Sequence, residues 1–185
     1  GEGEGGIDGV AHYQFQIGND WTVPGTVFTP ADPKGTVLLI ADAGRKTQAA
    51  SVKALLAKGL RVIAFDPFFF GESKIKSRDF LHVILMHAVG ERSLGVQSGQ
   101  ITALANWAKN EFGGGVNLKS IGPRLSVAAR LAAVQTDAIA TVELEQPMKS
   151  LKEVITGNKG ANHLPEMMCH GLLEQFDLEQ IEALR

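Results

Sequence analysis

A short connection between a predicted strand and a predicted helix has the spacing of a turn that presents a catalytic side chain. Residues 122–126 read Gly-Pro-Arg-Leu-Ser, between an apolar alternation at residues 116–121 and an alanine-rich helical pattern at 125–134. In such a turn a central nucleophile projects toward the substrate, and the residues beside it must be small. The central residue here is Arg124, whose guanidinium stays charged at neutral pH and cannot attack a carbonyl.

Two other serines are candidates to replace the missing nucleophile. Ser126 falls in the first helical turn, where a serine more commonly supports the helix start than faces a substrate. Ser73 follows the predicted strand at residues 61–65 by a short loop. One hypothesis is therefore an active carboxylic-ester hydrolase that uses a non-standard serine, with its acid and base supplied by residues outside this chain.

Arg124 itself has two interpretations. It could bind a phosphate or carboxylate at the start of the helix, where anions are already favoured, which would make the chain an anion-binding module. It could also be a structural arginine paired with Asp66 or Glu145. We favour the structural pairing.

Asp66 and the three phenylalanines that follow it closely are candidate pocket residues. An aspartate directly after a buried strand more often caps a turn than acts as a catalytic acid. Phe68, Phe69 and Phe70 fit the wall of an acyl pocket and a packed core equally well.

The sequence predicts neither a metal site nor a cofactor. His163, Glu166, Cys169 and His170 are of residue types that bind zinc, but their spacing matches none of the familiar zinc patterns. No phosphate loop of the form G-x-x-x-x-G-K-[ST] is present, and no G-x-G-x-x-G follows a predicted strand.

The elements that must position these residues alternate between strand and helix. Continuous apolar runs at residues 36–41 and 61–65 are typical of strands buried on both faces. Further strands are predicted at residues 12–17, 21–30, 116–121 and 139–144, and helices at residues 48–59, 96–112 and 125–134. Because parallel strands need crossover connections, we expect a three-layer α/β/α sandwich with a mostly parallel sheet and the first hairpin as its antiparallel edge.

The length of 185 residues suits a single domain. Residues 1–9 consist largely of glycine and acid, so we expect a flexible segment there and one domain over residues 10–185. Residues 80–89 are almost continuously apolar around His82 and His87, which indicates a buried or subunit-contact helix.

The order of these segments resembles the α/β-hydrolase superfamily. The stretches that carry the resemblance are VLLIADAGRK, RVIAFDPFFFGES, GPRLS before its alanine-rich helix, and IATVELEQPMKSLKEVI. The pattern is most similar to acetyl xylan esterases, dienelactone hydrolases and prolyl-oligopeptidase-like members. It covers roughly residues 11–185, and its most specific piece is FDPFFFGES at residues 65–73.

The resemblance implies an esterase-like site that is degenerate in this chain. It assigns the nucleophile turn to Gly122, Arg124 and Ser126, with arginine and serine where the family has serine and glycine. It assigns the oxyanion loop to Asp42, Ala43 and Gly44, where a carboxylate would oppose a developing oxyanion. The acid and histidine of the triad follow the nucleophile in the family, but no such pair is recognisable here, and the sheet could lack its last strands.

Composition and charge limit the classes of partner that the sequence predicts. The chain is 44% hydrophobic with a formal net charge of −2, which gives no reason to expect nucleic acid or a membrane as a partner. A single cysteine excludes an intrachain disulfide. We expect a soluble protein of undetermined compartment, since a signal peptide removed earlier would leave no trace.

We therefore expect a catalytically degenerate esterase-like domain with a binding or accessory role. Its expected partners are a small ester or carbohydrate-derived ligand and, through an exposed sheet edge, a second copy of the chain.

Overall fold

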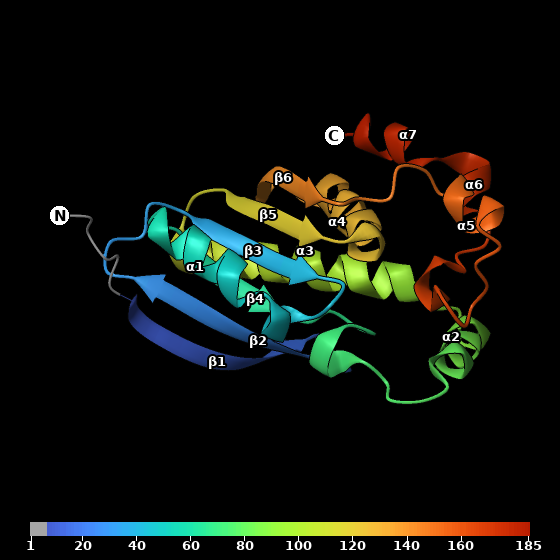
Figure 1. The fold of residues 1–185 in the computed structure, drawn as a ribbon, viewed down its shortest axis with the longest axis horizontal. Helices are drawn as coiled ribbons and strands as arrows, with labels where there is room; N and C mark the ends of the chain where they lie inside the picture. The colour runs from blue at the N-terminus through green and yellow to red at the C-terminus, as the bar shows by residue number, and fades with distance from the viewer. Residues whose placement is uncertain (1–6) are drawn as a thin grey trace.

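A twisted six-stranded sheet forms the centre of the molecule in the computed structural model, which describes residues 7–185 (Figure 1). The strands are β1 (Ile7–Ile17), β2 (Trp21–Pro30), β3 (Thr36–Ala41), β4 (Arg61–Phe65), β5 (Val116–Ile121) and β6 (Ile139–Glu145). Their order across the sheet is β1-β2-β4-β3-β5-β6. Strands β3 to β6 run parallel, whereas β1 and β2 form an antiparallel hairpin at one edge. The predicted mostly parallel sheet with an antiparallel edge hairpin is confirmed.

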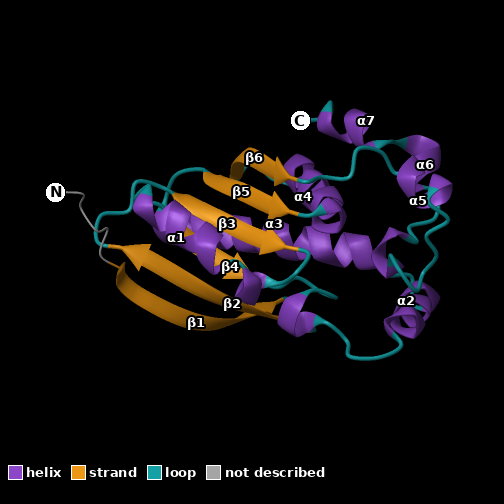
Figure 2. Cartoon of the chain, viewed as in Figure 1, coloured by secondary structure: helices purple, strands orange, loops and turns teal. Residues whose placement is uncertain are grey.

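Helices cover both faces of this sheet. Figure 2 shows α1 (Ala49–Ala57) in front of the sheet and α3 (Ser93–Phe112) and α4 (Pro123–Gln135) behind it. Every residue of β3 is buried, because this strand lies in the middle of the sheet with helices on both sides. The side chains that pack under α1 are Val37, Leu39, Val52, Leu55, Leu56, Val62 and Ala64. The larger core lies on the opposite face, against α3 and α4.

The remaining helices gather beyond the carboxyl ends of the parallel strands, at the right of Figure 1. They are α2 (Asp79–Ala88), α5 (Lys152–Thr156), α6 (Leu172–Gln175) and α7 (Leu178–Glu182), with 3-10 turns η1 (Arg45–Thr47), η2 (Gly71–Ser73) and η3 (Pro165–Met167). Helix α7 returns to pack against α4, where Arg130 pairs with Glu182. The carboxyl ends of the strands, where ligands bind in open α/β sheets, are therefore partly covered by the chain itself.

Two details differ from the sequence predictions. Strand β1 begins at Ile7 rather than at residue 12, because its pairing with β2 extends as far as Pro30. Residues 7–9 of the expected flexible segment are therefore in a strand, and the rest of that segment lies outside the described residues. Helix α2 was expected to be buried or in a subunit contact. Among its described side chains only Val83 is buried and those at its outer face are exposed, so the helix is not buried within the chain, while the subunit contact stays a prediction. Those outer residues are Leu81, Ile84, Leu85 and, just after the helix, Val89. Within residues 7–185, no helix has the length and apolar character that crossing a bilayer requires.

Candidate functional site

The connection between β5 and α4 has the tight geometry that the sequence predicts. Gly122 adopts a φ of 108°, which L side chains rarely take, and Pro123 opens the helix. A Cβ at position 122 would lie 2.5 Å from Cγ of Asp42, so only glycine allows this carboxylate to approach. The turn therefore brings the start of α4 against the loop that follows β3.

The carboxylate of Asp42 occupies the start of α4. Its Oδ2 accepts the backbone N–H of Arg124 at 2.9 Å, and its Oδ1 accepts that of Leu125 at 2.8 Å. Burial raises the pKa of Asp42, and nearby Glu166 adds to the rise. The two N–H donors and the charge of Arg124 oppose it without cancelling it. The free N–H groups of this helix end are thus already used by the chain's own anion.

The side chain of Arg124 is held by a carboxylate from a distant part of the sequence. Its Nε and Nη2 donate to the two carboxylate oxygens of Glu166 at 2.5 and 2.6 Å, a bidentate geometry. Its guanidinium carbon also lies 4.6 Å from the centre of the Phe70 ring. The interpretation of Arg124 as a paired arginine agrees with this geometry, but the expected partners Asp66 and Glu145 were wrong.

Asp66 holds two loops together instead. Its Oδ1 accepts the backbone N–H of Arg45 at 2.7 Å, its Oδ2 accepts that of Glu72 at 3.1 Å, and its carboxylate pairs with the Arg45 guanidinium. The side chain is 1% exposed. Asp66 is therefore a buried structural group rather than a pocket residue, because both of its carboxylate oxygens bond to residues of the loops after β3 and β4.

The loop after β3 offers few donors to a bound oxyanion. The N–H of Asp42 donates to the carbonyl of Ile121 at 2.9 Å, and that of Gly44 donates to the carbonyl of Ala41 at 2.8 Å. Of the expected oxyanion residues Asp42, Ala43 and Gly44, two therefore have their backbone donors in internal hydrogen bonds. The carboxylate of Asp42 in addition places negative charge beside the turn.

The two candidate serines are both engaged with the backbone. Ser126 is fully buried; it donates to the carbonyl of Pro123 at 2.6 Å and accepts the N–H of Met148 at 3.1 Å. Ser73 donates to the carbonyl of Asp66 at 2.8 Å. Over the described part of the chain, neither hydroxyl is hydrogen-bonded to a histidine, which a serine nucleophile needs as its base.

The three phenylalanines divide between core and surface. Phe69 and Phe70 are 2% and 1% exposed and belong to the main core, so for these two residues the packed-core alternative is confirmed. Phe68 is half-buried and lines a cavity of about 370 Å³ between the loop after β4 and the β1–β2 hairpin. Its ring packs against Trp21 with a centroid distance of 4.8 Å.

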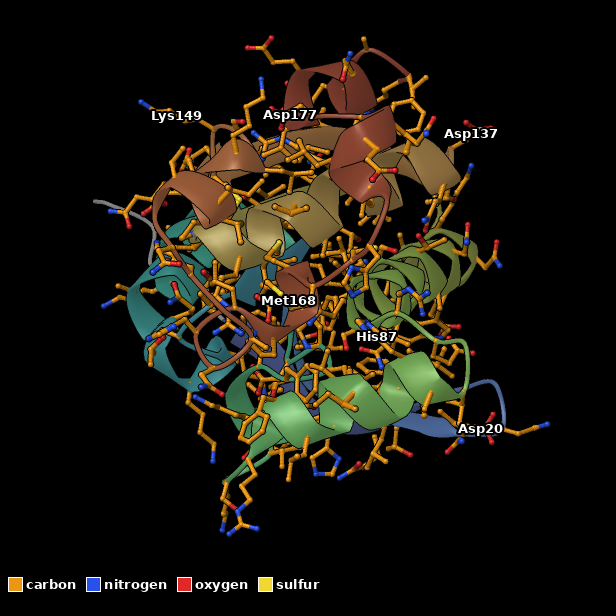
Figure 3. All side chains as sticks on the ribbon, turned by 90° about the vertical axis from the view of Figure 1, so that its right-hand side faces the viewer. Asp20, His87, Asp137, Lys149, Met168 and Asp177 are labelled. Carbon is orange, nitrogen blue, oxygen red and sulfur yellow. The ribbon has the colours of Figure 1, made fainter. Side chains whose placement is uncertain are left out.

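The histidines and the cysteine do not form a metal site. In residues 7–185, no group of three or more His, Cys, Asp or Glu side chains is arranged to hold a metal ion. Glu166 binds Arg124, while His87 and His170 make a ring contact at 5.7 Å. Figure 3, which faces the carboxyl ends of the strands, shows His87 of α2 and Met168 near the centre of this face. Burial, Arg92 and His170 lower the pKa of His87, and burial raises the pKa of the Cys169 thiol.

Comparison with known proteins identifies the architecture. No protein-family model matches the sequence, and no curated protein matches it. A structure assigned as an acetyl xylan esterase from Bacteroides fragilis covers 72% of the chain at 13% identity, with a TM-score of 0.61. A thermostable carboxyl esterase from Bacillus coagulans covers 86% at 16% identity with a TM-score of 0.57, and a dienelactone hydrolase from Anabaena variabilis covers 73% at 16% identity with 0.51. This chain has the α/β-hydrolase fold.

The α/β-hydrolase fold gives the turn at Gly122 its significance, because this is the turn on which the fold presents its nucleophile. The chain spans 43%, 56% and 62% of the length of these three solved structures. At such low identity the likeness establishes the fold and leaves the activity to be argued from the site.

Two features of the site were not found from the sequence. Glu166 was considered only as a metal ligand, because nothing in the irregular stretch around it indicates that it reaches Arg124, 42 residues earlier. The charge of Asp42 was recognised as unfavourable to an oxyanion, but not its bonds to Arg124 and Leu125. The closest signal was a glycine at 122 directly before a helix, which leaves room for a neighbouring carboxylate.

Proposed function

We propose that this chain is a non-catalytic domain of the α/β-hydrolase fold, with a binding or accessory role. The observation that carries the proposal is the carboxylate of Asp42 on the N–H groups of Arg124 and Leu125. In an active member, the N–H of the residue after the nucleophile, here Leu125, helps to stabilise the oxyanion. The carboxylate of Asp42 occupies that donor, and its negative charge would repel an oxyanion that formed nearby.

The size of this effect supports the proposal. Loss of one oxyanion donor in a serine hydrolase costs about 10²- to 10³-fold in kcat. Here a donor is lost and a buried negative charge is added at the same point. Arg124 adds a second obstacle, since it provides no nucleophile and is held in place by a buried carboxylate.

The hypothesis of an active ester hydrolase keeps one supporting observation. Ser73 lines the cavity beside Phe68 and is only partly buried. Against it, the hydroxyl proton of Ser73 is donated to the carbonyl of Asp66, and no described imidazole contacts the hydroxyl. The anion-binding hypothesis is weaker still, because Asp42 and Glu166 already take up the N–H groups and the guanidinium on which it depends.

Hydrolysis of short-chain esters tests the proposal. We expect purified protein to release p-nitrophenol from p-nitrophenyl acetate, and acetate from acetylated xylo-oligosaccharides, no faster than an equal concentration of the Ser73→Ala variant. Saturable turnover by the original chain that disappears in Ser73→Ala would overturn the proposal in favour of the hydrolase. Turnover that survives in Ser73→Ala but disappears in Ser126→Ala would overturn it equally.

A further inference from the structure

The cavity beside Phe68 is separate from the occupied turn at Arg124. Phe70 contacts Arg124, whereas Phe68 contacts Trp21 at the start of β2, and neither Arg124 nor its partner Glu166 lines the cavity. The volume of about 370 Å³ falls within the range of small-molecule sites. The cavity lies at the same end of the sheet as the carboxyl end of β4, because β2 runs antiparallel to β4 and begins there.

A buried amide faces this cavity with an unused donor. Gln100 lines the cavity and is 3% exposed. Its Oε1 accepts the backbone N–H of Phe68 at 2.9 Å, and because a backbone N–H can only donate, this contact fixes which end of the amide is oxygen. Nε2 donates to no protein atom among the described residues, and it is not sealed from solvent. A buried amide donor of this kind favours a ligand that offers it an acceptor.

Two of the residues that line the cavity are aromatic. Trp21 and Phe68 meet edge to face at an interplanar angle of 62°, and both are only partly buried. Their exposed faces suit the C–H face of a ring that carries polar groups on its rim. Gln14 and Thr22 at the open side supply further amide and hydroxyl groups, and the Thr22 hydroxyl donates to Gln16, which leaves its oxygen free to accept.

The cavity has no unbalanced charge. Glu72 is its single ionisable lining residue, and hydrogen bonds from Lys46 and Arg45 lower the pKa of its carboxyl. Both carboxylate oxygens of Glu72 are paired with these two cations. An anionic or cationic ligand would therefore find no free counter-charge, whereas hydroxyl groups would find donors and acceptors on several sides.

We propose that this cavity binds a neutral saccharide, with one sugar ring in contact with Trp21 and Phe68 and one of its oxygens accepting the Nε2 proton of Gln100. Gln14 and Thr22 hydrogen-bond the outer hydroxyls. The site deepens the proposed binding role by naming its ligand class, and it rests on that role.

Two-dimensional ¹H–¹⁵N NMR of the whole chain tests the proposal, because its two tryptophans report on different places. Trp21 lines the cavity, while Trp107 packs against Phe15 and Phe112. On titration with xylobiose, cellobiose or maltose, we expect the indole N–H signal of Trp21 to move saturably and that of Trp107 to stay. The proposal is overturned if the Trp21 signal does not move with any of the three sugars at its highest soluble concentration. A stronger response to glucose 6-phosphate or to indole, which are charged and apolar probes, overturns it as well.

Two variants and a control then locate the site through saturation transfer to the sugar protons. Gln100→Glu keeps the acceptor for Phe68 but replaces the donor, and we expect it to weaken binding by about 5- to 10-fold, the equivalent of one lost hydrogen bond. Trp21→Ala should abolish the signal, and Trp107→Phe should leave it unchanged. If Trp21→Ala and Gln100→Glu both bind the sugar as strongly as the original chain does, the sugar binds elsewhere and the assignment is overturned.

The two proposals fail separately. Ester turnover overturns the non-catalytic role whatever the NMR titration gives, and an unresponsive Trp21 overturns the saccharide site without restoring a nucleophile to the turn.

Discussion

The ion pair between Arg124 and Glu166 gives the turn after β5 a structural role. The carboxylate of Glu166 is fully buried, whereas a fifth of the Arg124 side chain remains exposed. A buried carboxylate without its cation is strongly unfavourable, so the pair stabilises the fold chiefly by preventing that state. Any return of serine to position 124 would have to deal with Glu166 as well as with Asp42.

Replacing Arg124 alone should therefore lower the free energy of unfolding more than replacing both Arg124 and Glu166. We expect Arg124→Met to lower the free energy of unfolding by about 3 to 5 kcal/mol, because it leaves Glu166 buried and uncompensated. The double variant Arg124→Met/Glu166→Met should recover most of that loss. Urea unfolding measures both, with Lys149→Met as the control, since Lys149 is exposed. Additive losses in the double variant would show that the two side chains are not coupled.

Asp42 should make stability depend on pH in the unusual direction for an acid. Burial raises its pKa above the ordinary value of 3.8, so the folded state binds the proton more tightly than the unfolded state does. The contribution of Asp42 is then full below pH 3.8 and is lost as the pH rises through the raised pKa of the folded state. We expect the unfolding free energy of the original chain, relative to Asp42→Asn, to decrease from pH 4 upward and then to level off. A relative stability that increases over this range would show that the pKa is lowered.

At the scale of elements, helix α7 depends on one aspartate. Asp177 caps the helix in a capping box with Gln180, and it also accepts the N–H of Leu151 at 2.8 Å and the hydroxyl of Ser150. Burial alone would raise the pKa of Asp177, but these hydrogen bonds and nearby Lys152 outweigh it and lower the pKa. The cap therefore joins α7 to the segment after β6.

Loss of this cap should loosen the end of the chain. We expect Asp177→Ala to lower the free energy of unfolding by about 1 to 2 kcal/mol, the usual cost of a lost N-cap. Because the pKa of Asp177 is lowered, its contribution is present above pH 3.8 and lost as the pH falls through the lower value. Thermal unfolding at pH 7 and pH 3 measures both effects, with the exposed Glu179→Ala as the control. Equal losses in the two variants at pH 7 would contradict the capping role.

The elements were largely predictable because their patterns are local. The bounds of β2, β3, β4 and β5 agree with the sequence prediction, since turn residues and apolar runs fix strands independently of the rest of the chain. The environment of α2 was predicted less well. Its nearly continuous apolar pattern indicated a buried or subunit-contact helix. Val83 is buried, whereas Leu81, Ile84 and Leu85 are exposed.

At the scale of the whole molecule, the site was harder to predict than the fold. The candidate residues named from the sequence lie just after β3, β4 and β5, because parallel topology brings the carboxyl ends of these strands to one edge of the sheet. The pairing of Glu166 with Arg124 depends on the path of the segment after β6, and the bonds of Asp42 depend on how closely the loop after β3 approaches Gly122. Neither has a periodic signal in the sequence. The bonds of Glu166 to Arg124 and of Asp42 to α4 therefore became visible only in three dimensions.

The edge of the sheet at β6 is a candidate surface for dimer formation. Strand β6 lies at one edge, and Arg185 donates to the carbonyls of Ile139 and Ala140 there, while most of the strand is exposed. An open strand edge invites pairing, so we predict a dimer formed through it. Light scattering over a range of concentrations should give about twice the chain mass of 19.8 kDa. A mass of one chain at every concentration would contradict this prediction.

The central claim, that the turn at Arg124 is a structural connection without a working nucleophile, is tested most directly by intact-mass spectrometry after treatment with a fluorophosphonate, which labels activated serines. The account predicts that the mass of the protein stays unchanged, because no imidazole among residues 7–185 is hydrogen-bonded to Ser73 or Ser126 and Asp42 accepts the N–H of Leu125. A single stoichiometric adduct would contradict it, and the modified serine would then identify the nucleophile.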